Sequence, residues 1–153
     1  MKKQYELLIS QLRALIQGES NRVSVLANAT ALLKQTFPER FFWVGFYMVA
    51  DGELQLGPFQ GTVACYHIGK GRGVCGTAWA EQRTLIVPDV EQFPGHIACS
   101  SESRSEIVVP LIGKDNNVVG VLDIDSTALN AFDETDQLYL EQTAKILTEA
   151  LAY

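Results

Sequence analysis

The sequence predicts an α+β fold, in which a central, mostly antiparallel sheet has helices on one face and pocket-forming loops on the other. The chain has 153 residues, the usual size of one domain, and 47% of them are hydrophobic, which is typical of a packed core. Near both ends of the chain, apolar residues recur at helical spacing, and the segments between them are aromatic and β-branched. The chain has no repeat or low-complexity linker, so we expect residues 1–153 to form a single domain.

The spacing of apolar residues predicts two helices near the start of the chain and one at its end. The first covers residues 5–17, and the second follows a cap at Ser20 or Asn21 and ends at Pro38. The last helix begins directly after its cap, Asp133. The residues expected on the three inner faces are Leu8, Leu12, Leu15 and Ile16; Val23, Leu26, Ala29 or Thr30, and Leu33; and Leu140, Ala144, Leu147 and Leu151.

Strand-like segments fill the middle of the chain. Residues 41–48 are aromatic and β-branched, and Asp51-Gly52 is a strong hairpin signal before a second strand at 53–58. Residues 89–104 have neither period, and an irregular segment of that length inside one domain is usually functional. The other elements that we expect are strands at 62–68, 85–87, 107–112 and 118–124 and a short helix at 75–82.

The charge of the chain excludes several classes of partner. It has 18 acidic and 12 basic side chains, a net charge of −6 and a pI near 4.8. Such a chain has little basic surface for phosphates, so we expect no nucleic acid and no anionic membrane as partner. No stretch approaches the roughly 18 apolar residues of a membrane span, and the N-terminus has no signal-peptide pattern, so we expect a cytoplasmic protein.

The chain has three cysteines, Cys65, Cys75 and Cys99. An odd number in a cytoplasmic protein argues against a static disulfide framework. No C-x-x-C pair is present, and only His67 and His96 are available to join the thiols, so we expect no metal site. The cysteines are then either buried as small apolar side chains or the carriers of redox chemistry.

Cys99 is the strongest nucleophile candidate, because it lies in the irregular segment and on no apolar face. Cys75 follows a glycine-rich turn at the expected start of a helix, where backbone N–H groups would lower its pKa. Cys65 lies on an expected strand. The spacing leaves open which of these two reaches Cys99.

A set of carboxyl groups gathers around the last two strands. Asp123 and Asp125 point to the same face of their strand, because side chains alternate along it, and Glu106 directly precedes the other strand. Both aspartates could simply meet solvent at the strand end. Alternatively they form a pocket that attracts an ammonium group or a metal, or that holds a carboxyl protonated. An inward-pointing Glu106 would have a raised pKa and could donate a proton.

Two other patterns allow a structural and a functional interpretation. Gly71-x-Gly73-x-x-Gly76 matches a dinucleotide fingerprint in letters, but no strand–helix–strand repeat surrounds it, so a tight turn beside a pocket is favoured. Trp43 and Tyr47 share one strand face and form either part of the core or a wall for an apolar ligand group. His67 and His96 receive no role.

Several segments together resemble a GAF domain, and within that family the free methionine-(R)-sulfoxide reductases. The GAF-like segments are Gly120-Val121-Leu122-Asp123 and Asn130-Ala131-Phe132-Asp133-Glu134-x-Asp136. Five motifs similar to the reductases follow one another over nearly the whole chain. They are Gly57-Pro58-Phe59-Gln60-Gly61, Gly71-Arg72-Gly73-Val74-Cys75-Gly76, Gly95-His96-Ile97-Ala98-Cys99, Ser105-Glu106-Ile107-Val108 and Leu122-Asp123-Ile124-Asp125-Ser126.

The resemblance implies an oxidoreductase without a cofactor, which reduces free methionine-(R)-sulfoxide. Cys99 would attack the sulfoxide sulfur, and Cys65 would condense with the resulting sulfenic acid to a disulfide that thioredoxin reduces. Cys75 matches a cysteine that is secondary to turnover. The other matched residues are Glu106 and Asp125, which would polarise the sulfoxide oxygen; Asp123 and Asp89, which would hold the ammonium group; and Trp43, which would pack on the methyl group.

The resemblance also implies a homodimer, although an amphipathic first helix is equally explained by packing within one chain. Two other functions stay open. A GAF module can bind a small molecule without turnover, because fold alone does not determine function. Alternatively, the thiols can act as a redox sensor, in which a Cys65–Cys99 disulfide forms under oxidant and alters a partner.

Overall fold

The computed structural model describes residues 1–97 and 99–153, and its centre is one six-stranded antiparallel sheet. The strand order is β3-β2-β1-β6-β5-β4, so the two hairpins β1–β2 and β5–β6 meet along the β1–β6 pair. The strands are β1 (Trp43–Ala50), β2 (Glu53–Gln60), β3 (His67–Ile68), β4 (Leu85–Val87), β5 (Ser105–Ile112) and β6 (Val118–Ser126).

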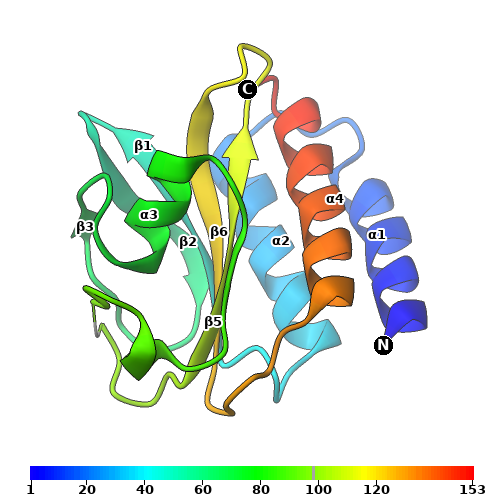
Figure 1. The fold of residues 1–153 in the computed structure, drawn as a ribbon. Coiled ribbons are helices and arrows are strands. Elements are labelled where there is room, and N and C mark those ends of the chain that lie inside the picture. Colours follow the sequence, from blue (N-terminus) through cyan, green and yellow to red (C-terminus); the bar gives the residue numbers. More distant parts are fainter. Residues whose placement is uncertain (98) are drawn as a thin grey trace.

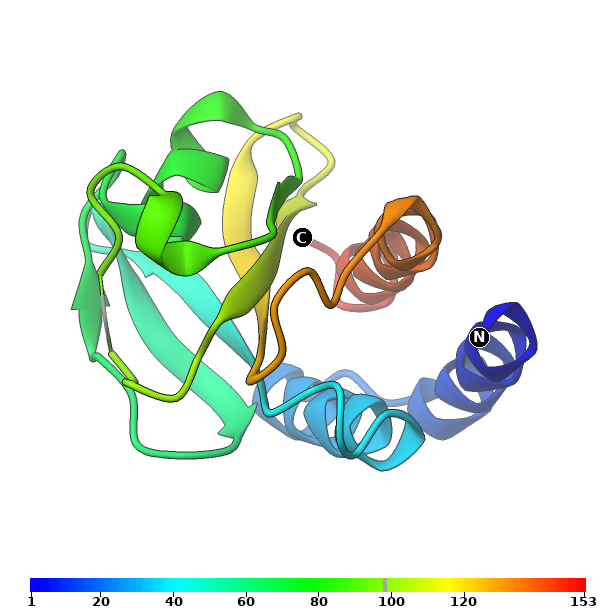
Figure 2. The same cartoon turned by 60° about the horizontal axis from the view of Figure 1, so that its bottom comes forward.

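Three helices cover one face of the sheet, and loops with one short helix cover the other (Figures 1 and 2). On the first face, α2 (Arg22–Thr36) packs on β1 and β2, α4 (Glu134–Ala150) packs on β5, and α1 (Lys2–Ile16) packs on α2 and α4. On the second face lie α3 (Gly73–Glu81) and a 3₁₀ turn, Val90–Gln92. The expected layers are confirmed, except that α3 joins the loop face. Within the described residues, no helix is both long and apolar enough to cross a membrane.

Local sequence signals explain where most elements begin and end. Asp51 and Gly52 both have positive φ, as the tight β1–β2 turn requires. The Asn21 side chain caps α2 by accepting a hydrogen bond from Ser24 N at 3.0 Å. Asp133 caps α4, and the Asp136 side chain accepts a hydrogen bond from Asp133 N at 3.0 Å.

Two residues expected on inner helix faces are exposed. Leu15 is 47% exposed and Val23 is 69% exposed, so both assignments are wrong. The cause in α1 is its packing between two helices, which rotates the buried stripe to Tyr5, Leu8, Leu12 and Ile16. In α2 the buried stripe begins at Val25 instead.

The strand expected at residues 62–68 is also wrong, because only His67–Ile68 pair with β2. The backbone before them is held by side chains. Trp43 Nε1 donates to the Thr62 carbonyl at 2.9 Å, and the Tyr47 hydroxyl donates to the Cys65 carbonyl at 3.0 Å. Satisfied in this way, these carbonyls need no strand partner, and the segment forms a loop over the sheet.

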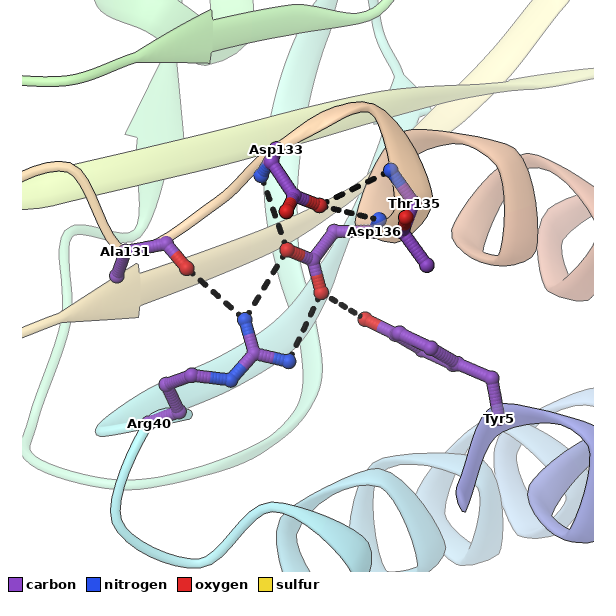
Figure 3. Close-up of polar contacts among 6 residues, drawn as sticks. All are labelled: Tyr5, Arg40, Ala131, Asp133, Thr135 and Asp136. Atoms are coloured by element: carbon purple, nitrogen blue, oxygen red, sulfur yellow. Dashed lines mark hydrogen bonds and ion pairs between the residues drawn. The ribbon is translucent and has the colours of Figure 1, made fainter. Parts of the chain in front are cut away.

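A buried ion pair connects the helices to the start of β1 (Figure 3). Arg40 donates to both oxygens of the Asp136 carboxylate, at 2.8 and 3.1 Å, and to the Ala131 carbonyl at 2.9 Å. The Tyr5 hydroxyl donates to Asp136 Oδ1 at 2.5 Å. Since Asp136 is buried and charged, these donors replace the water that it loses. They also attach α1 and α4 to the connection that leaves β6.

We predict that Tyr5→Phe lowers the free energy of unfolding by about 1–3 kcal/mol, the usual effect of removing one partner from a buried hydrogen bond. Urea unfolding followed by circular dichroism measures this loss. Tyr139→Phe is the matched control, because Tyr139 stacks on Tyr5 with centroids 5.1 Å apart and the substitution keeps the ring. Equal stability of the two variants would contradict the role of the Tyr5 hydroxyl.

Candidate active site

A cavity of about 50 Å³ lies on the loop face of the sheet. Its floor comes from β1, β5 and β6, and its walls come from α3, the segment after Gly61 and the irregular segment before β5. Seven of the nine residues singled out in the sequence line it. They are Trp43, Tyr47, Cys75, Cys99, Glu106, Asp123 and Asp125.

Three carboxyl groups meet at the cavity floor. Asp123 and Asp125 point to the same side of β6, and Glu106 on β5 is the direct register partner of Asp125. Glu106 is 6% exposed and Asp123 is 5% exposed, so the alternative of solvent-facing aspartates is wrong for Asp123. Their strand neighbours Leu122 and Ile124 point to the opposite face, into the core under the helices.

Burial controls the protonation of this cluster. Loss of water raises the pKa of Glu106 well above the ordinary glutamate range, and the neighbouring Asp123 and Asp125 raise it further. Burial and the charge of Asp123 likewise raise the pKa of Asp125. The pKa of Asp123 also rises on burial, although hydrogen bonds from Glu106 and Cys75 oppose the rise. The cluster therefore holds protons at a pH where exposed carboxyls are ionised.

One oxygen of this cluster has no protein partner. Asp123 Oδ1 is buried and makes no hydrogen bond to the part of the chain that the structure describes. A buried oxygen in this state is stabilised by a ligand that brings a donor, such as an ammonium group. Cys75, Glu106 and Asp123 also place ligand atoms within 4.8 Å of one another, close enough to reach one metal ion. Burial raises the pKa of Cys75 and of Glu106 well above their usual ranges, so both would have to lose a proton first, and the absence of a metal site stays a prediction.

Cys65 and Cys99 form a disulfide, with Cα atoms 5.6 Å apart. The sequence left open whether Cys65 or Cys75 reaches Cys99, and in this state of the protein the residue bonded to Cys99 is Cys65. Cys99 lines the cavity, whereas Cys65 stands behind it on the loop that Trp43 and Tyr47 hold. A thiol in the cavity is thus joined to a thiol on the outer loop.

Cys75 does not have the lowered pKa expected at a helix start. Its thiol is buried at the third residue of α3, and burial raises its pKa well above the ordinary thiol value. Asp123, Glu106 and Asp125 raise it further. Desolvation and three carboxyl groups therefore outweigh the effect of the helix N-terminus.

Aromatic rings form one wall of the cavity. Trp43 stacks between Tyr47, at 6.0 Å between centroids, and Phe59, at 5.2 Å. Gly45 and Gly61 lie against the faces and edge of the indole, and a Cβ at Gly61 would come within 2.5 Å of Trp43 Cδ1. The absence of these side chains lets the indole lie flat beside the carboxyl cluster, as a wall for an apolar group.

Asp89 does not reach the cavity. Its side chain accepts a hydrogen bond from Glu91 N at 3.0 Å and caps the 3₁₀ turn Val90–Gln92. In this state, Asp89 is therefore not placed to contact an ammonium group in the cavity. His67, which received no role, is exposed and hydrogen-bonds to the Glu53 carboxyl through its Nδ1, away from the cavity.

Five polar residues of the cavity were not assigned a role from the sequence: Thr62, Arg72, His96, Ser100 and Ser103. Arg72 and His96 are the basic side chains among the described lining residues, and each lies within a motif of the resemblance. Ser103 Oγ is buried without a partner in the described chain and adjoins Asp125. Residue spacing gave no signal for any of them, because they come from loops whose course depends on the whole fold.

The glycine-rich segment forms a tight turn beside the cavity, as expected. Gly71 and Gly73 have positive φ, and Gly71 N donates to the Gly76 carbonyl at 2.8 Å. A side chain at Gly76 would collide with the Gly69 carbonyl. The turn places Arg72 and Gly73 in the cavity wall.

The family model described as "GAF domain" matches residues 20–152. The chain belongs to the GAF-domain family. It is 60% identical to "GAF domain-containing protein A" of Dictyostelium discoideum, over 95% of this chain and 90% of that protein. It is 46% identical to the "Free methionine-R-sulfoxide reductase" of Escherichia coli, over 97% and 88%. A free methionine-R-sulfoxide reductase from Neisseria meningitidis, solved with its substrate, superposes with a TM-score of 0.92 at 51% identity, over 96% of this chain and 87% of that one.

The motifs that carry the reductase resemblance surround the cavity of this GAF domain. Segment 57–61 ends at the indole of Trp43, segment 71–76 forms the turn into α3, and segments 105–108 and 122–126 supply the three carboxyl groups. Segment 95–99 supplies His96 and Cys99, while its Ala98 lies outside the described residues. Similarity and geometry therefore point to the same face of the sheet.

We predict that Glu106→Gln stabilises this GAF domain at neutral and alkaline pH. The pKa of Glu106 is higher in the folded protein than in the unfolded chain, where it is about 4.3. The stability that protonated Glu106 contributes is therefore complete below the unfolded pKa, and it is lost as pH rises through the folded pKa. Glutamine has no proton to lose, so the stability gain of the variant grows from near zero at low pH to at least about 1.4 kcal/mol, the equivalent of one pKa unit.

Denaturant unfolding of wild type and Glu106→Gln from pH 4 to pH 9 measures the difference. Glu102→Gln is the matched control, because Glu102 is exposed in the same segment. A difference between wild type and Glu106→Gln that stays constant with pH would contradict the raised pKa.

Proposed function

We propose that this protein reduces free methionine-(R)-sulfoxide to methionine by thiol chemistry at Cys99. The observation that carries the proposal is the Cys65–Cys99 disulfide at the edge of a cavity that holds three carboxyl groups, of which Glu106 and Asp123 are buried and Asp125 is half-buried. A neutral sulfoxide is a poor electrophile until its oxygen gains a proton. A carboxyl with raised pKa beside the nucleophile supplies that proton at neutral pH.

The reaction has two steps at sulfur. The Cys99 thiolate attacks the sulfoxide sulfur while Glu106, assisted by Asp125, protonates the sulfoxide oxygen; the oxygen passes to Cys99 as a sulfenic acid, and methionine leaves. The Cys65 thiol then attacks Cys99 Sγ, water leaves, and the disulfide forms. The disulfide in the structure corresponds to the product of this second step.

The cavity offers complementary groups for the rest of the substrate. Asp123 Oδ1, buried without a partner in the described chain, would accept from the ammonium group. Trp43 and Tyr47 would pack on the methyl group, and Arg72 offers a cation for the carboxylate. A methionine inside a polypeptide has neither free terminus, so this set favours the free amino acid.

Turnover requires a reductant for the disulfide, and we propose thioredoxin in the cytoplasm. We further propose that residues 1–153 act as one domain, since α1 is attached to α4 through the Tyr5–Asp136 hydrogen bond. A homodimer is the third part of this proposal, supported by the exposed Leu7 and Leu15 on the outer side of α1. Sedimentation at the mass of one chain would contradict the dimer.

We predict that wild type oxidises NADPH through thioredoxin reductase and thioredoxin only with the free (R) sulfoxide, and that Cys99→Ser abolishes this turnover. The (S) epimer, a peptide-bound sulfoxide and the Cys75→Ser variant are the comparisons, since Cys75 is free and buried. A redox sensor would instead form its disulfide with peroxide and show no preference between epimers. A binding module would show no turnover with any sulfoxide.

We predict that Glu106→Gln lowers kcat/KM by about 10²- to 10⁴-fold, the usual contribution of a general acid. Wild-type activity should fall as pH rises through the raised pKa of Glu106, because only its protonated form donates. The variant should lack this alkaline limb. Glu102→Gln should retain the wild-type profile, and the same alkaline limb in Glu106→Gln would assign the proton donor to another group.

A further inference from the structure

The outer side of the disulfide is flanked by exposed apolar side chains. Val63 is 87% exposed and Tyr66 is 74% exposed, and these are the two highest values among the large apolar residues that the structure describes as exposed. Cys65 stands between them in the chain and is half-buried. Single exposed apolar residues are common on protein surfaces, but here the most exposed ones gather at a redox-active bond.

The loop that presents these side chains is held from the inside. Its carbonyls accept hydrogen bonds at three places: at Thr62 from Trp43 Nε1, at Cys65 from the Tyr47 hydroxyl, and at Tyr66 from Leu56 N at 3.0 Å. The backbone on both sides of Cys65 is therefore fixed before any partner arrives. A surface ordered in advance loses less entropy on binding than a flexible one.

The position of the two sulfurs determines which one a bulky thiol can reach. An attacking thiolate approaches one sulfur in line with the S–S bond, opposite the sulfur that leaves. Cys99 lines the cavity and Cys65 does not, among the residues that the structure describes. Both cysteines are half-buried, but an attack on Cys99 meets the walls of a cavity of about 50 Å³, whereas Cys65 lies outside the lining of that cavity.

We propose that Val63 and Tyr66 form the docking surface for a dithiol protein reductant of the thioredoxin class, which attacks Cys65. The inference rests on the proposed function, because only repeated turnover requires this reductant. The occupant follows from the chemistry of the surface: a disulfide sulfur that needs a thiolate, surrounded by apolar side chains that need an apolar partner face. The docked protein covers the loop, including Val63 in the cavity wall.

The exchange balances in two displacements. The first thiolate of the reductant bonds to Cys65 Sγ, the Cys65–Cys99 bond breaks, and Cys99 leaves as a thiolate that takes up a proton. The second thiol of the reductant then displaces Cys65 from the mixed disulfide, and Cys65 takes up the second proton. The reductant loses two electrons and two protons and becomes a disulfide, and this chain returns to two thiols.

The test compares a protein reductant with a small one. Because Val63 also lines the cavity, Tyr66 is the residue to change. We expect Tyr66→Ser to raise the KM for thioredoxin by about fivefold or more, as when an anchor side chain is lost from an interface. Tyr66→Phe, which keeps the ring, should stay near wild type. Val23→Ser is the control for an exposed apolar residue away from the disulfide.

Turnover driven by dithiothreitol separates the two proposals, because a small dithiol needs no docking surface. It should be equal in wild type and Tyr66→Ser. A thioredoxin KM unchanged in Tyr66→Ser, with dithiothreitol turnover intact, overturns the docking surface. No sulfoxide turnover by wild type with either reductant overturns the proposed function instead.

A trapping measurement covers the case in which Tyr66→Ser folds poorly. Oxidised wild type is mixed with a thioredoxin that has only its attacking cysteine, and peptide mass spectrometry locates the mixed disulfide. Attachment to Cys65 supports the proposal, and attachment to Cys99 overturns it.

Discussion

The structure depends on three carboxyl groups gathered at the β5–β6 pair, two of them buried (Glu106 and Asp123) and one half-buried (Asp125). Glu106 and Asp125 face each other in register, and Asp123 lies on the same side of β6. Like charges this close destabilise a sheet unless protons neutralise them, and desolvation adds to the penalty. The alternation of side chains along β6 offsets part of this cost, because Leu122 and Ile124 reach the opposite face and join the core beneath α2 and α4. The strand β6 thus supplies two of the three carboxyl groups and the apolar side chains that pack beneath them.

The aromatic wall connects this cluster to the outer loop. Tyr47 stacks on Trp43 within the cavity, and its hydroxyl donates to the carbonyl of Cys65. Burial, followed by the charges of Asp123 and Cys75, raises the pKa of Tyr47, so the hydroxyl keeps its proton and stays a donor. The residues that would hold the substrate methyl group therefore also fix the loop of the resolving thiol. In the proposed mechanism, substrate binding and disulfide formation would therefore share this aromatic wall.

The sequence predicted the elements that have local causes. The Asp51-Gly52 hairpin, the Asp133 cap and the shared face of Asp123 and Asp125 follow from neighbours in the chain, and all three are confirmed. Predictions failed where distant groups decide. The raised pKa of Cys75 comes from carboxyls some 30 to 50 residues away in sequence, and the strand expected at 62–68 is a loop held by β1 side chains. No signal in the sequence indicated that Arg72 and Ser103 line the cavity, for the same reason: tertiary contacts determine where their loops lie.

The two buried charge clusters of this protein differ in one respect that bears on function. At Asp136, both carboxylate oxygens have donors, from Arg40 and Tyr5, so the cluster is satisfied by the protein alone and serves stability. At Asp123, Oδ1 has no donor in the described chain, although Glu106, Cys75 and His96 all act on this carboxyl group. A fold that satisfies one buried carboxylate with four hydrogen bonds is able to satisfy another. The oxygen that is unpaired in the described chain is therefore best explained as a place left for a ligand that brings a hydrogen-bond donor.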